Sequence, residues 1–122
     1  MPSPKRRNIS QRSEMVYDVH NFGVILDTRE IFVSPPLDES LDTACIDHKV
    51  YHQFVRNLQI LNSIGSEPIL VHLGSCGGDW NYGMGIYDAI YASCQDEQSS
   101  DIIVLSHVHA RSMSSVIPQA AT

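Results

Sequence analysis

The sequence predicts an α/β fold in which short apolar strands alternate with longer helices. Residues 68–73 and 102–106 are almost wholly apolar and bounded by polar residues, as parallel strands buried on both faces are. Residues 46–61 and 81–94 instead repeat apolar side chains every three or four positions, the spacing of an amphipathic helix. Strands and helices that alternate in this way form consecutive βαβ units with right-handed crossovers.

A hairpin is predicted before the first helix. Residues 22–26 and 30–33 are rich in β-branched and aromatic side chains, and residues 27–29 can turn between them. Pro35 and Pro36 end the second strand, because proline has no amide hydrogen to donate to a neighbouring strand.

The first helix should be amphipathic, with its apolar stripe running from Ile46 to Leu61. Asp42 or Thr43 is predicted to cap its amino end, since both side chains can accept a hydrogen bond from a backbone amide. Gly65 is predicted to end the helix.

The second helix, at residues 81–94, is followed by a polar loop at residues 95–100 and by the strand at 102–106. A glycine turn at residues 75–78 leads into this helix, and Ser112 opens what is predicted to be the next helix. Both features then lie at the carboxyl ends of strands, where α/β proteins bind ligands.

Length and charge restrict the function. A chain of 122 residues suffices for one domain with one core. Residues 1–13 carry four basic and no acidic side chains, whereas residues 14–122 carry four basic and 14 acidic ones, a net charge of −10. An acidic body of this kind argues against nucleic-acid binding by charge.

Residues 1–15 are predicted to form a basic flexible arm, and residues 16–122 a single α/β domain. No apolar run approaches the roughly 20 residues of a membrane span, and the basic start lacks the apolar core of a secretory signal. We therefore expect a cytoplasmic protein. Three cysteines without a C-x-x-C spacing predict free thiols in a reducing compartment.

Ser112 has two interpretations when only its surroundings are considered. It can cap a helix, or it can be a nucleophile, which needs a base and donors for an oxyanion. Gly77 and Gly78 permit a tight turn close to a carbonyl oxygen, and the Met113 amide lies next to the serine. The glycines can equally serve the turn alone, so the residues by themselves leave both interpretations open.

Three motifs together resemble the ClpP family, the proteolytic subunit of the ATP-dependent Clp protease. They are Ser75-Cys76-Gly77-Gly78, Gly83-Met84-Gly85-Ile86-Tyr87-Asp88 and Ala110-Arg111-Ser112-Met113. The family shows Ser-Pro-Gly-Gly, Gly-Met-x-Ile-Tyr-Asp and Ala-Ser-Met in the same order. The resemblance covers residues 22–122, with a similar first strand at residues 29–33.

The resemblance implies a ClpP/crotonase-like fold of repeated β-β-α units and a role for three residues. Ser112 matches the nucleophile, and the backbone amides of Gly78 and Met113 match the two oxyanion donors. Cys76 stands where the family has proline, and Arg111 stands where it has a small residue. The arginine beside the nucleophile is expected to crowd the site or to select acidic substrates.

The family places its catalytic histidine and aspartate after the serine, and residues 113–122 hold neither. We therefore expect an amino-terminal fragment of a serine-type endopeptidase, truncated before the carboxyl-terminal part of the fold and inactive as it stands. The complete protein is expected to form a ring of identical subunits. An AAA+ ATPase unfoldase would deliver unfolded proteins, whose peptide bonds the ring hydrolyses without a cofactor or metal.

Two alternatives stay open. A non-catalytic structural subunit of a ClpP-like ring would explain Arg111 and the absent histidine and aspartate. An acyl-CoA enzyme of the related crotonase fold would also use two backbone amides as an oxyanion hole, and would not need Ser112.

The histidines are predicted to have structural or solvent-facing roles. His107 and His109 alternate near a strand end, and His48 and His52 lie one helical turn apart. Each pair lacks the third protein ligand that a zinc site requires.

Overall fold

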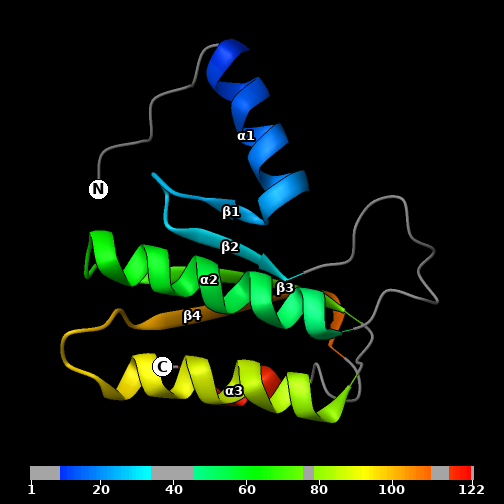
Figure 1. Cartoon of the computed structure of the whole chain (residues 1–122), viewed down its shortest axis with the longest axis vertical. Helices are drawn as coiled ribbons and strands as arrows, with labels where there is room; N and C mark the ends of the chain where they lie inside the picture. The colour runs from blue at the N-terminus through cyan, green and yellow to red at the C-terminus, as the bar shows by residue number, and fades with distance from the viewer. Residues whose placement is uncertain (1–8, 34–45, 76–78, 111–115, 122) are drawn as a thin grey trace.

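The computed structural model describes residues 9–33, 46–75, 79–110 and 116–121, and the statements below concern these residues. They form a four-stranded mixed sheet with three α-helices and a short 3-10 helix (Figure 1). The elements are α1 (Ile9–Phe22), β1 (Val24–Ile25), β2 (Glu30–Val33), α2 (His48–Ile64), β3 (Ile69–Ser75), α3 (Trp80–Gln95), β4 (Ile102–Ala110) and η2 (Ile117–Ala120). None of these helices is long and apolar enough to cross a membrane.

The strands are ordered β1-β2-β3-β4 across the sheet. The short β1 pairs antiparallel with β2, whereas β2, β3 and β4 are parallel. Ile31, Val71 and Val104 are aligned across the three parallel strands. The α/β class, the hairpin and the two βαβ connections predicted from the sequence are thereby confirmed.

One face of the sheet carries the core. Alternate residues of β3, Ile69, Val71 and Leu73, are fully buried against α2 and α3, which lie together on that face (Figure 1). On the opposite face Ile103 is 53% and Leu105 46% exposed. The prediction of strands buried on both faces is therefore wrong for β4. Composition cannot distinguish an apolar residue of the core from one on a face that these helices leave uncovered.

Helix α2 begins later than the sequence analysis expected. Its amino-terminal cap is Asp47, whose Oδ1 accepts a hydrogen bond of 3.0 Å from the Val50 amide. The predicted caps, Asp42 and Thr43, lie outside the described residues and too far upstream to cap a helix that starts at His48. The predicted end at Gly65 is confirmed.

Helix α1 was not expected, because residues 9–15 were assigned to the flexible arm and residues 22–26 to a strand. Gly23 explains the difference. It has a φ of +67°, and its amide donates to the carbonyls of Asp18 and Val19 at 3.0 Å each, which ends α1 as a left-handed glycine typically does. The apolar run is thus divided between a helix end and the two-residue β1.

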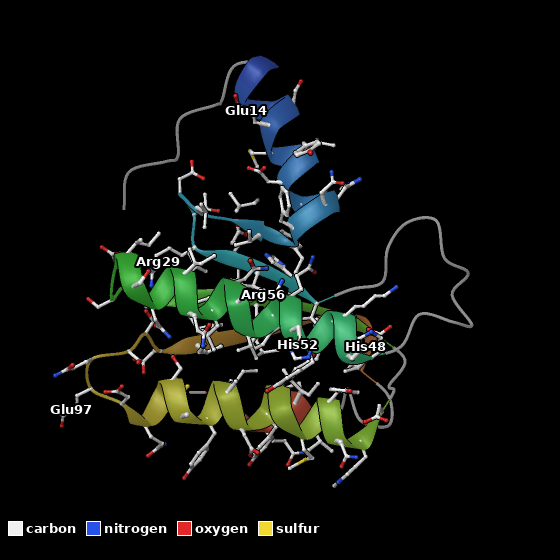
Figure 2. The ribbon with its side chains drawn as sticks, viewed as in Figure 1. Glu14, Arg29, His48, His52, Arg56 and Glu97 are labelled. Carbon is white, nitrogen blue, oxygen red and sulfur yellow. The ribbon has the colours of Figure 1, made fainter. Side chains whose placement is uncertain are left out.

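At the amino-terminal edge of the parallel strands, one buried side chain, that of Arg29, connects the end of α2 with the segments before β3 and β4. The Arg29 guanidinium donates to the carbonyls of Leu61, Gly65 and Glu67 at 3.0 to 3.2 Å, and to Ser100 Oγ at 2.6 Å. These partners belong to the end of α2 and to the segments that lead into β3 and β4. Figure 2 shows Arg29 near this end of α2 and His48 at the other end of the helix.

Candidate active site

The carboxyl ends of β3 and β4 lie side by side. The two strands are parallel, and their last residues, Ser75 and Ala110, pair with each other. Gly78 is three positions after Ser75, and Ser112 is two positions after Ala110. The segments that carry the predicted nucleophile and oxyanion donor therefore leave the sheet from adjacent positions, at the edge where α/β proteins bind ligands.

The predicted catalytic residues themselves lie outside the described residues. Gly78 belongs to residues 76–78, and Ser112 and Met113 belong to residues 111–115. Their roles stay predictions, and the structure contributes the elements on either side of them.

The ladder between β3 and β4 is irregular at this edge. Leu73 pairs with Ser106 but Ser75 pairs with Ala110, so two steps along β3 face four steps along β4. Such bulges bend a strand and redirect its side chains, and they are frequent beside active sites. His107 and His109 lie within this stretch of backbone, beyond the strand end predicted at residue 106, and their side chains are outside the described part of the structure.

Helix α3 begins directly after the glycine turn. Asp79 caps it, because its Oδ1 accepts a hydrogen bond of 3.1 Å from the Tyr82 amide. The Asp79 amide donates to the Ile46 carbonyl at 2.9 Å, which joins the starts of α3 and α2. The amide groups and positive dipole end of α3 therefore lie next to residues 76–78, an arrangement that favours negative charge.

The position of α3 depends on a close contact that sequence reasoning missed. A Cβ atom at Gly85 would lie 2.6 Å from Cε2 of Tyr51 on α2, so only glycine allows this approach. Ile86 and Ile90, on the same helix, are fully buried in the core. Burial of Ile86 accounts for the isoleucine of the Gly-Met-x-Ile motif. Gly85 stands at the variable position of that motif, and in this chain it permits the close approach of α3 to α2.

The chain is also anchored after Ser112. In η2, Ile117 and Ala120 are buried in the same core as α3. A helix opened by Ser112 is predicted from the sequence, and the part of this region that is described is the 3-10 helix η2, with Pro118 in its first turn. The described elements before and after residues 111–115 are thus β4 and the buried η2.

His48 and His52 on α2 each lie near an aromatic ring. The His48 ring lies 6.2 Å from the Tyr82 ring, and the His52 ring 5.0 Å from that of Tyr51, between ring centres. Over the described ranges, no group of three or more His, Cys, Asp or Glu side chains could hold a metal ion.

His72, which carried no signal in the sequence, lies on the open face of the sheet. Its Nε2 is 2.9 Å from Oε1 of Glu30, and its ring stacks on Phe32 at 4.5 Å between centres. The three residues are neighbours only because β2 and β3 pair, so no local pattern could have predicted them.

Comparison with known proteins supports the assignment of the motifs. The family model of the Clp protease matches residues 11–122. The structure is similar to ClpP1 from Listeria monocytogenes, with a TM-score of 0.64 and 23% identity over 79% of this chain and 48% of that chain. It is also similar to the ClpP protease catalytic domain from Plasmodium falciparum, with a TM-score of 0.66 and 21% identity over 95% of this chain and 54% of that chain.

No curated protein matches the chain in sequence. The chain spans about half the length of the solved structures it resembles. At their level of identity, the similarity to these structures shows the fold. The family model, in contrast, matches well over half of the chain. The chain therefore belongs to the Clp protease family.

Proposed function

We propose that this chain is part of a serine-type endopeptidase in which Ser112 is the nucleophile and the amides of Gly78 and Met113 hold the oxyanion. The observation that carries the proposal is the pairing of Ser75 with Ala110, since the two motif segments leave the sheet from these adjacent positions. Family membership supports the same assignment.

In the proposed mechanism Ser112 Oγ attacks the carbonyl carbon of a peptide bond. The carbonyl oxygen becomes an oxyanion that accepts hydrogen bonds from the two amides, and the amino end of α3 adds a favourable dipole. A histidine takes the serine proton and gives it to the leaving amine, and an aspartate orients that histidine. In the ClpP family both of these residues follow the serine, and residues 113–122 contain neither.

We also propose that the complete protein forms a cytoplasmic ring of identical subunits with a crotonase-like fold of repeated β-β-α units. An ATPase unfoldase would supply it with unfolded proteins. The apolar side chains of Ile103 and Leu105 support assembly, because a sheet face with exposed apolar residues is stabilised when another subunit covers it.

A fluorophosphonate probe tests the nucleophile directly. In the catalytically complete protein the probe should label Ser112, and Ser112→Ala should remove the label. Ser114→Ala is the matched control, two positions along, and should be labelled normally. Labelling of the Ser112→Ala variant at the same rate would contradict the assignment.

The same measurement addresses the non-catalytic alternative, which Arg111 favours because it places a cation beside the nucleophile. If the ring assembles fully but the probe does not label it, the chain is a structural subunit. Recovery of labelling in Arg111→Ala would then show that the arginine blocks the site.

A further inference from the structure

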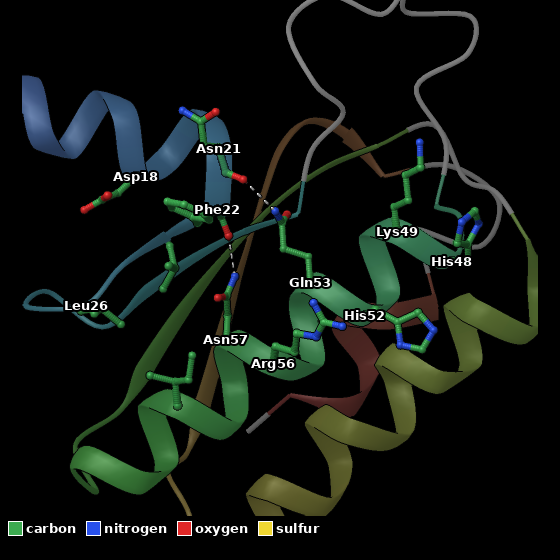
Figure 3. Close-up of a pocket in the computed structure, with 12 residues that line it drawn as sticks. Asp18, Asn21, Phe22, Leu26, His48, Lys49, His52, Gln53, Arg56 and Asn57 are labelled. Carbon is green, nitrogen blue, oxygen red and sulfur yellow. Dashed lines mark hydrogen bonds between the residues drawn. The ribbon is translucent and has the colours of Figure 1, made fainter.

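A cavity of about 690 Å³ lies between α1, β1 and α2, away from the paired strand ends (Figure 3). Its volume is within the range of roughly 300–1,000 Å³ that is typical of ligand sites. Apolar side chains of Phe22, Val24 and Leu26 line it from the end of α1, from β1 and from the turn after β1. Helix α1 also supplies the acidic side chain of Asp18, and α2 supplies mainly polar and basic side chains. None of the lining residues comes from α3, β3 or β4, so the cavity is separate from the candidate active site.

Lys49 and Arg56 outnumber Asp18 in the lining, so the cavity carries a net positive charge, whereas residues 14–122 as a whole carry −10. Residues 14–122 contain four Lys or Arg residues, of which Arg29 is buried and Arg111 lies outside the described residues. The other two, Lys49 and Arg56, are exposed and both line this cavity. Neither forms an ion pair with another described residue, which leaves both charges available to a ligand.

The basic side chains form a row along α2. Lys49, His52 and Arg56 are three and four positions apart, so they share one face of the helix (Figure 3). Lys49 and Arg56 are seven residues apart, which corresponds to about 10 Å along the helix axis. A compact ion would meet one of these side chains at a time, whereas an elongated ligand with several negative groups meets the whole row.

The cavity also contains hydrogen-bond acceptors. Asn57 is 6% exposed, and its Nδ2 donates to the Phe22 carbonyl at 2.7 Å. Gln53 Nε2 donates to the Asn21 carbonyl at 3.4 Å (Figure 3). Within the described structure, Asn57 Oδ1 and Gln53 Oε1 receive no hydrogen bond. Asn57 is the buried one of the two. A buried acceptor is normally satisfied by a hydrogen-bond partner, and a peptide N–H can be that partner.

We propose that this cavity binds a short acidic peptide segment of a partner protein in an extended conformation. Successive side chains of an extended peptide point to opposite sides. Alternating acidic and apolar residues would therefore place carboxylates against Lys49 and Arg56, apolar groups against Phe22 and Leu26, and backbone N–H groups near Asn57. This site does not depend on the proposed peptidase activity.

Isothermal titration calorimetry with the whole chain and the peptide Glu-Leu-Glu-Leu-Glu tests the site. We expect saturable binding, and binding at least about tenfold weaker for Gln-Leu-Gln-Leu-Gln and for Glu-Ser-Glu-Ser-Glu. Equal binding of the glutamine peptide, or no saturable binding of the first peptide, would overturn the proposal. Displacement of the peptide by inorganic phosphate at equal ionic strength would also overturn it, because the site would then recognise a single anion.

A pair of double variants separates the cavity from general charge. Lys49→Gln with Arg56→Gln should weaken binding of the acidic peptide about tenfold. Gln59→Glu with Gln98→Glu makes the same change in net charge at exposed positions outside the cavity, and should leave binding unchanged. Circular dichroism of both variants verifies that they are folded. If both weaken binding equally, the attraction comes from net charge and the cavity is not the site.

Discussion

The two edges of the parallel sheet are built differently, although the same strands end at both. At the amino-terminal edge one buried side chain, Arg29, binds the end of α2 and the segments before β3 and β4. At the carboxyl-terminal edge, the paired residues Ser75 and Ala110 follow a bulge and lead into glycine-rich and serine-containing segments. Side-chain hydrogen bonds fix the first edge, and the second is the edge at which we propose that backbone amides hold an oxyanion.

This difference suggests that stability and chemistry are divided between the edges. The Arg29 contacts satisfy carbonyls at a helix end, which have no partner within the helix. The amides proposed to hold an oxyanion must instead remain free for substrate. Changes at the amino-terminal edge should therefore alter the free energy of unfolding, and changes at the carboxyl-terminal edge should alter turnover.

The largest expected effect is at the carboxyl-terminal edge. Ser112→Ala in the catalytically complete protein should lower peptide hydrolysis by roughly 10³-fold or more, because the nucleophile is lost. Its unfolding temperature should stay within a degree or two, since a hydroxyl is replaced by hydrogen. Hydrolysis of a fluorogenic peptide and thermal unfolding measure the two quantities. A large loss of stability without loss of turnover would contradict the division.

At the opposite edge, Arg29→Met should lower the free energy of unfolding by about 3–4 kcal/mol. The substitution removes four hydrogen bonds and leaves buried carbonyls without a donor. Arg56→Met, on the exposed face of α2, is the matched control and should change stability by less than about 0.5 kcal/mol. Urea denaturation measures the free energy of unfolding of both variants. Equal losses would show that the Arg29 hydrogen bonds do not stabilise the fold.

Between the edges, Gly85→Ala should lower the free energy of unfolding by about 1–3 kcal/mol, because the added methyl group would overlap the Tyr51 ring. Gly74→Ala is the control, since a Cβ there meets nothing within 4 Å. The double variant Gly85→Ala with Tyr51→Leu should lose less free energy of unfolding than the two single variants lose together. Strict additivity in this double-mutant cycle would argue against the contact.

The sequence predicted what local patterns encode. Residues 68–73 and the stripe from Ile46 to Leu61 became β3 and α2, because burial of alternate or helically spaced residues selects these structures. The end of α2 at Gly65 followed from the properties of glycine. The candidate site could be predicted only to the level of motifs at two strand ends, which the pairing of β3 with β4 then brought together.

The features that were missed depend on contacts between distant residues. Arg29 reaches partners 32 to 71 positions away, and Gly85 is explained by Tyr51 on another helix. Neither contact leaves a periodic pattern in the sequence. The exposed side chains of Ile103 and Leu105 have the composition of a core strand, so only the placement of the helices reveals that they are on the open face.

The smallest expected effect tests where α2 begins. Asp47→Ala should lower the free energy of unfolding by about 1 kcal/mol, because the Val50 amide loses its acceptor and the first turn of α2 loses its cap. Asp42→Ala and Thr43→Ala should have little effect if Asp47 is the cap. Reversed results would place the start of α2 upstream, and would also move His48 and Lys49 away from the first turn. The Asp79 amide, at the start of α3, donates to the Ile46 carbonyl at the start of α2. Loss of the α2 cap should therefore weaken this hydrogen bond and make amide hydrogen exchange at Asp79 faster.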